Sequence, residues 1–453
     1  MEPTAAAGML NVRDRRASLL FLIACLCVGS ALRLYGIRDA GVIFPDDLRA
    51  YSGQVVVDAL TAPDAAFSER LAAAHRTAVE QTGARPALAW FTAIPAALGF
   101  LRIGDLYIPF ALCAITTILL IWLLGNKWFD AITAFFSALW FATSAASVGY
   151  SRSALPVGPA TALMVLGLFV LTNSAGEKRN PWRIVATGGC FAVAFAFHPA
   201  YLAYLSVPVF LLFMPHLKTL APRHESSPVA QRSFLRLFFE CFCLVLPTIL
   251  IVILYDAPQV LTNGVHGRFA IADMSYVSGL RTLFDSPTIY SGVHEGVLFW
   301  PEYLKSAEGT LGFVVILIAI VSFAKFSRSA ASVVLAAWML LPWMAFALWP
   351  NLNSYGRLYA PVLPAVALMV GRGVSCSLMR LPVRVRTALL PLFSVLIIGT
   401  GLAATTPFLR TEGKEPSLGR YMDANKFQSI IGFVRTDVRS LKGTRVVSVF
   451  TPD

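Results

Sequence analysis

The sequence predicts an all-α polytopic membrane protein, a bundle of about eleven transmembrane helices with two large extracytoplasmic loops. Three observations support this fold class. Of the 453 residues, 57% are hydrophobic and 14% are charged, whereas soluble domains carry about 45–50% apolar and about 25% charged residues. The mean hydropathy is +0.67. Basic residues gather at short connections between apolar runs, so the net charge of +12 reflects membrane topology and not nucleic-acid binding.

The apolar runs define the predicted spans, because about 20 apolar residues are needed to cross a bilayer as a helix. A further apolar stretch, 86–101, is short and interrupted by Pro95, and we predict a re-entrant or interfacial helix there. The predicted spans are 17–36, 106–125, 130–149, 155–173, 183–198, 200–215, 235–256, 308–324, 331–349, 357–374 and 386–404.

The positive-inside rule assigns the two sides of the membrane. Each basic cluster between spans falls on the cytoplasmic side if the N-terminus is cytoplasmic and the C-terminus extracytoplasmic. We therefore expect a multi-pass protein of the cell membrane, with one transmembrane domain at 1–404 and outer loops at 37–105 and 257–307. The segment 405–453 is predicted to be a short extracytoplasmic tail. A larger domain that is cut short is one explanation for it, because it ends just after a strand-like stretch.

The first outer loop contains a cluster of ionisable residues, Pro45-Asp46-Asp47-Leu48-Arg49. A carboxylate at the membrane surface can act as a general base that takes the proton of an attacking hydroxyl. A neighbouring arginine keeps a carboxylate ionised and binds phosphate in a bidentate manner. The alternative is a helix cap, because Pro-Asp-Asp can open an amphipathic helix over 47–60. One aspartate can serve each role.

Several further arginines are predicted on the outer side, where the positive-inside rule makes them less expected. Arg85 stands before Pro86 at the start of a helix, an unfavourable place for a cation unless it meets an anion. Together with Arg49, the outer arginines form a candidate pocket for an anionic ligand. The alternative is a set of interfacial anchors whose side chains reach toward the headgroups. The other arginines of the candidate pocket are Arg152, Arg268 and Arg357.

His198 lies between two short spans, in Phe197-His198-Pro199. At the predicted outer face it could contact a phosphate or carry a proton. The alternative is a hydrogen-bonded structural histidine at a helix junction. Trp300 and Tyr303 allow two interpretations as well, because aromatic side chains also form the belt at a membrane interface.

The order of these features resembles that of the GT-C glycosyltransferases, and most closely the protein O-mannosyltransferase and lipid A aminoarabinose transferase group. The resemblance covers about 17–375. The segments that carry it are Pro45–Arg49 with Tyr51, Arg85-Pro86, Tyr150-Ser151-Arg152, His198, Arg268-Phe269, Phe299–Tyr303 and Arg357-Leu-Tyr359-Ala-Pro361. The chain departs from the family pattern at Asp47, at Leu155–Gly158 and at His198, where the family has a Glu, an Asp and a Lys.

The resemblance implies transfer of a sugar from a polyprenyl-phosphate donor to a lipid, protein or glycan acceptor on the extracytoplasmic face. Asp46 would be the catalytic base, with Asp47 beside it. No cofactor is certain, and a divalent cation on these two carboxylates is left open. A non-catalytic member of the fold, or a transporter of a lipid-linked anion, is the alternative. The residues implied in substrate binding are Arg49, Tyr51, Arg85, Arg152, His198, Arg268, Trp300, Tyr303, Arg357 and Tyr359.

Overall fold

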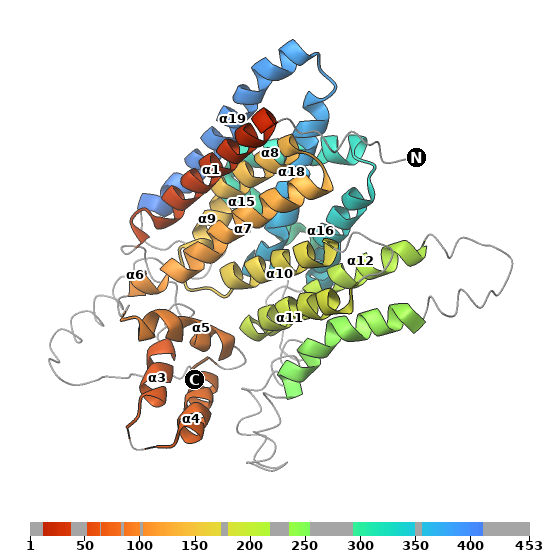
Figure 1. Ribbon diagram of the computed structural model, residues 1–453. Coiled ribbons are helices and arrows are strands. Elements are labelled where there is room, and N and C mark those ends of the chain that lie inside the picture. The colour runs from red at the N-terminus through yellow and green to blue at the C-terminus, as the bar shows by residue number, and fades with distance from the viewer. Residues whose placement is uncertain are drawn as a thin grey trace.

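The computed structural model describes residues 12–37, 52–63, 65–82, 86–99, 103–173, 180–217, 235–253, 293–348 and 356–410 (Figure 1). Every regular element in these ranges is helical. The elements are α1 Val12–Leu34, α3 Ser52–Leu60, α4 Phe67–Thr82, α5 Pro86–Ala97, α6 Ile103–Leu106, α7 Ile108–Trp128, α8 Ala131–Thr143, α9 Ala145–Ser151, α10 Val157–Thr172, α11 Pro181–Phe197, η3 Pro199–Leu205, α12 Ser206–Leu217, an unlabelled helix Leu235–Ile253, α15 Val293–Phe326, α16 Ala330–Leu348, α17 Gly356–Tyr359, η5 Ala360–Val362, α18 Leu363–Leu378 and α19 Val383–Arg410.

The predicted all-helical membrane fold is confirmed, since a helix or consecutive helical pieces lie over the described part of each predicted span. Among the described residues, six helices are long and apolar enough to cross a membrane, or seven if the bent pair α8–α9 is one span. The remaining apolar helices are shorter, and α5 is one of them. The chain is therefore a multi-pass membrane protein. The predicted strand-like stretch of the tail beyond Arg410 lies outside the described residues.

Helices α3, α4 and α5 form a small group with its own apolar core, beside the end of the bundle where α6 and α7 begin (Figure 1). Gly53 of α3 lies directly against the backbone of α5, because a Cβ atom there would stand 2.3 Å from the carbonyl carbon of Thr92. The predicted helix 86–101 is confirmed as α5, with Pro95 inside it. The predicted helix 47–60 is seen as α3 from Ser52, and its earlier residues lie outside the described ranges.

The predicted span 130–149 is not one straight helix. It breaks at Ser144 into α8 and α9, which are bent by 57°. Side chains of three other helices satisfy backbone groups at this break. Arg33 of α1 donates to the carbonyls of Phe141 and Ala142, and Thr405 of α19 donates to that of Thr143. Glu308 of α15 accepts from the N-terminus of α9. Broken backbone at membrane depth requires such partners.

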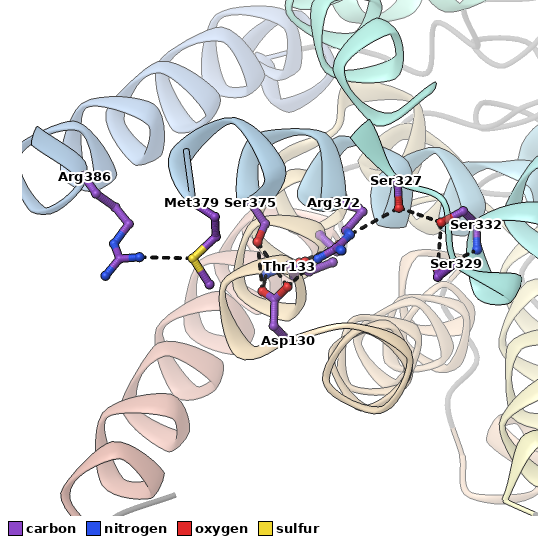
Figure 2. Close-up of polar contacts among 10 residues, drawn as sticks. Asp130, Thr133, Ser327, Ser329, Ser332, Arg372, Ser375, Met379 and Arg386 are labelled. Atoms are coloured by element: carbon purple, nitrogen blue, oxygen red, sulfur yellow. Dashed lines mark hydrogen bonds and ion pairs between the residues drawn. The ribbon is translucent and has the colours of Figure 1, made fainter. Parts of the chain in front are cut away.

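The other end of the bundle is held by Asp130, which precedes α8 (Figure 2). Its carboxylate accepts from Thr133 N at 2.7 Å and thereby caps α8. It also pairs with Arg372 of α18 at 2.7 Å and accepts from Ser375 Oγ. Arg372 Nε donates in turn to Ser327 Oγ, between α15 and α16. One carboxylate thus connects α8 to α18 and, through Arg372, to the α15–α16 turn.

Candidate functional site

The ionisable motifs that the sequence singles out most strongly lie outside the described residues. These are Asp46, Asp47, Arg49, Tyr51, Arg85 and Arg268. The helices that follow two of these motifs are described. Helix α3 begins at Ser52, directly after Tyr51, and α5 begins at Pro86, directly after Arg85. Since α3 packs on α5, the two motifs precede helices that are fixed to each other. The roles of these six residues stay predictions.

Four of the described site residues, His198, Trp300, Tyr303 and Tyr359, belong to an aromatic cluster, a continuous series of ring contacts. The series runs His198, Tyr201, Tyr204, Phe346, Tyr359, Phe299 and Tyr303, with Trp300 also against Tyr359. Consecutive ring centroids are 5.2–6.3 Å apart, the usual range for attractive aromatic pairs. The structure therefore brings Trp300, Tyr303 and Tyr359 together, and connects His198 to them through Tyr201, Tyr204 and Phe346.

Two buried polar atoms of the cluster have no hydrogen-bond partner among the described residues, the Oη of Tyr359 and the Nε1 of Trp300. The two rings are 6.3 Å apart, and both side chains are buried. Buried polar groups are normally hydrogen-bonded. These two atoms are consequently available to a water molecule or to a hydroxyl or phosphate oxygen of a ligand.

The segment that carries Arg357 is held in place by two buried donors. The Tyr204 hydroxyl donates to the carbonyl of Leu358 at 2.6 Å, and Trp338 Nε1 donates to that of Pro361 at 3.2 Å. Pro361 interrupts the helical hydrogen bonding here, so α17, η5 and α18 follow one another as separate pieces. The predicted single helix 357–374 is thus irregular at its start. Arg357 is partly exposed, while Tyr359 is fully buried.

His198 has a structural contact in addition to its place in the aromatic cluster. It ends α11 and precedes Pro199, and its extended backbone makes it the N-cap of η3. Its Nδ1 accepts a hydrogen bond from Ala200 N at 3.2 Å. The side chain is buried. This geometry corresponds to the structural alternative, and a direct contact of His198 with substrate stays a prediction.

Arg152 is committed to the C-terminus of α1. Its guanidinium donates to the carbonyls of Leu32, Arg33 and Tyr35, the last at 2.6 Å. Carbonyls in the last turn of a helix lack helical partners, so a cation is favourable there. Burial lowers the pKa of Arg152 from its usual value near 12.5. These carbonyl contacts satisfy the buried guanidinium of Arg152 without a phosphate. Its predicted role in the anionic pocket stays a prediction.

Arg33 and Glu308 are buried ionisable residues that the sequence analysis did not single out. Both lie inside or at the edge of apolar runs, where a charged residue is itself a signal of function or of helix fixation. Glu308 and Arg33 hold the break between α8 and α9 from two sides. Beside α9 lies a small, partly open pocket lined by residues of α7, α8, α9, α10, η5 and α18, among them Ser147 and Thr161.

Comparisons with known proteins agree with the fold. Residues 83–231 match the family model of the dolichyl-phosphate-mannose-protein mannosyltransferases. No curated protein matches the chain in sequence. The chain is similar to ArnT from Cupriavidus metallidurans bound to undecaprenyl phosphate, with a TM-score of 0.60 and 14% identity over 89% of this chain and 77% of that one. It is also similar to the oligosaccharyltransferase AglB from Archaeoglobus fulgidus in complex with an inhibitory peptide and a dolichol-phosphate, with a TM-score of 0.53 and 13% identity.

The match to AglB covers 93% of this chain and 60% of that one. Identities this low show a shared fold. The match to ArnT extends over most of the two chains, and the family model covers a central part that includes α5 to α12. The resemblance predicted from the motifs is therefore confirmed: the chain has the GT-C fold, and its residues 83–231 carry the sequence pattern of the mannosyltransferase family.

Proposed function

We propose that this chain is a GT-C glycosyltransferase that moves a sugar from a polyprenyl-phosphate donor to an acceptor on the extracytoplasmic face of the cell membrane. The observation that carries the proposal is the extent of the match to ArnT, 89% of this chain, in a structure whose ligand is undecaprenyl phosphate. The family model, defined on enzymes that use dolichyl-phosphate mannose, supports the same donor class.

The chemistry requires a base and a cation cluster. Asp46 would accept the proton of the acceptor hydroxyl as its oxygen bonds to the anomeric carbon. The bond from that carbon to the phosphate oxygen breaks, and the polyprenyl phosphate leaves with the electron pair. Arg49, Arg85 and Arg268 would stabilise the negative charge that develops on this phosphate. Asp47 would cap or support the helix that follows.

The described residues support a binding region at one end of the bundle. The aromatic cluster gathers Trp300, Tyr303 and Tyr359 there, and Arg357 is adjacent in sequence to a segment that Tyr204 holds. Sugars stack on aromatic faces and hydrogen-bond to polar atoms such as the Tyr359 hydroxyl. The group α3–α5 would hold the two motifs that precede its helices.

The direct test uses purified protein in lipid nanodiscs, with a panel of radiolabelled polyprenyl-phosphate sugars and membrane extract as the source of acceptor. We expect one donor to release polyprenyl phosphate while its label moves to a lipid, protein or glycan fraction. Undecaprenyl phosphate alone should inhibit this release. Binding of undecaprenyl phosphate with no release from any donor would overturn the enzymatic proposal and favour a non-catalytic GT-C protein.

A further inference from the structure

Helix α15 contains a break that the apolar pattern does not predict. Gly309 has φ +70° and ψ 165°, outside the helical region, and it divides α15 into an upstream half, 293–308, and a downstream half. A positive φ of this kind is easily reached only by glycine. The upstream half carries Trp300 and Tyr303, so the break separates the part of α15 in the aromatic cluster from the long apolar part.

Glu308 stands directly before this break and is buried, with 4% of its surface exposed. One carboxylate oxygen accepts from Ser144 Oγ at 2.6 Å and from Ala146 N at 3.1 Å. The other accepts from Ala145 N at 3.2 Å. A carboxylate at a helix N-terminus is favourable, because the unpaired amide donors point at it. Glu308 therefore joins the break in α15 to the break between α8 and α9.

The two pieces that Glu308 joins also meet through aromatic rings. Tyr150 is near the end of α9, and its ring lies 6.3 Å from that of Tyr303 in the upstream half of α15. α9 is anchored independently, since Arg33 bonds to its Ser147 hydroxyl and to the end of α8. The upstream half of α15 is thus held against α9 at its Glu308 end, and the helix is interrupted at Gly309 between this half and the downstream half.

We propose that Glu308 is a positioning residue, which sets the upstream half of α15 against α9 and so places Trp300 and Tyr303 beside Tyr359. The proposal rests on the proposed function for the identity of the donor, and on the contacts above for the positioning itself. In this proposal Glu308 acts through those aromatic residues, since the hydrogen bonds of its carboxylate within the described part of the chain are with residues 144–146.

Three variants separate the roles of Glu308. Glu308→Ala removes every contact to α9. Glu308→Gln keeps the size and one acceptor oxygen, but directs an NH₂ group at one of the amide donors, so it folds and holds α9 less firmly. Glu302→Gln is the matched control, because Glu302 is exposed on the same half of α15.

The first measurement needs no enzymatic activity. Cysteines replace Tyr150 and Tyr303 in a variant whose own seven cysteines are changed to serine or alanine, and a short bifunctional thiol reagent links them. Glu308→Gln should slow the linking about threefold, Glu308→Ala about tenfold or more, and Glu302→Gln not at all. An unchanged linking rate in Glu308→Gln would overturn the proposal even if Glu308→Ala fails to fold.

The second measurement is the kinetics of transfer from the donor identified above. Because Glu308→Gln displaces binding residues without removing the base, KM for the donor should rise about tenfold while kcat stays within about twofold. An equal fall of kcat with KM unchanged would contradict a positioning role. If wild-type protein uses no donor, the proposed function fails, and the linking rates still decide the role of Glu308.

Discussion

The two ends of the bundle use charged residues in different ways. At the α9 end, Arg33 and Glu308 are buried and bond mainly to backbone groups of broken helices. At the opposite end, Asp130 and Arg372 bond mainly to side chains around intact helices, and about a quarter of each side chain is exposed (Figure 2). Irregular backbone within a membrane protein must be satisfied by other residues. The α9 end has that irregularity, and it also contains the aromatic cluster.

The largest expected effect is the loss of Arg33. Arg33→Met leaves the buried carbonyls of Phe141 and Ala142 without their donor, at about 1–3 kcal/mol each, so we expect a free energy of unfolding lower by about 3 kcal/mol. Unfolding in mixed micelles with increasing SDS measures it. Arg384→Met, which removes an exposed cation from α19, is the control. Equal unfolding free energies of Arg33→Met and Arg384→Met would contradict a stabilising role of Arg33 at the α9 end.

Asp130→Ala should have the next largest effect, because it removes the cap of α8 together with the pair to Arg372. The expected loss is about 2 kcal/mol, the sum of a helix cap and a partly buried charged hydrogen bond. Asp130→Asn keeps an acceptor for Thr133 N and should recover about half of that loss. Both variants should retain donor affinity, and a fall in affinity would mean that this end is coupled to the site.

Tyr204→Phe tests the α9 end with a single oxygen atom. The hydroxyl that donates to Leu358 is removed, so the unfolding free energy should fall by about 1 kcal/mol. Since the same contact holds the segment of Arg357, the affinity for undecaprenyl phosphate should fall as well. Isothermal titration with that lipid in nanodiscs measures it. A lower unfolding free energy with unchanged affinity for undecaprenyl phosphate would contradict a role of Tyr204 in the binding site.

The smallest expected effect is that of Arg372→Met. The ion pair at 2.7 Å is partly exposed to solvent, and such pairs contribute less than about 1 kcal/mol. Adding salt should reduce the difference between this variant and the wild type, whereas it should leave the Arg33→Met difference unchanged. Salt sensitivity of both would contradict the burial of Arg33.

The sequence was sufficient to predict the apolar helices, because run length and composition determine which segments can lie in lipid. It did not predict α4 or the part of α15 before residue 308, which lie within the predicted outer loops. It did not reveal the breaks at Ser144 and Gly309. The run 130–149 has no proline, and its one glycine, Gly149, is at its end. The break is stabilised by the distant residues Arg33, Glu308 and Thr405. Contacts over more than 100 positions leave no local pattern in a single sequence.

For the site, the motifs predicted a shared region for residues far apart in the chain. The structure places Trp300, Tyr303 and Tyr359 in one aromatic cluster, to which His198 is joined through Tyr201, Tyr204 and Phe346. Their roles in substrate binding stay predictions. For Arg152, residue type and position in the sequence do not determine which partner the side chain binds. Its residue type and its place matched a phosphate ligand, but the carbonyls at the end of α1 offer a cation an equally good partner, and sequence spacing does not distinguish the two.

Asp46→Asn tests the proposed mechanism most directly, because in that mechanism the carboxylate next to the first span takes the proton of the acceptor. Transfer from the polyprenyl-phosphate donor is measured beside binding of undecaprenyl phosphate and thermal unfolding, with Asp47→Asn as the matched variant. The account predicts that Asp46→Asn loses transfer by about 100-fold or more while lipid binding and the unfolding temperature are retained. Full transfer by a folded Asp46→Asn protein would contradict it.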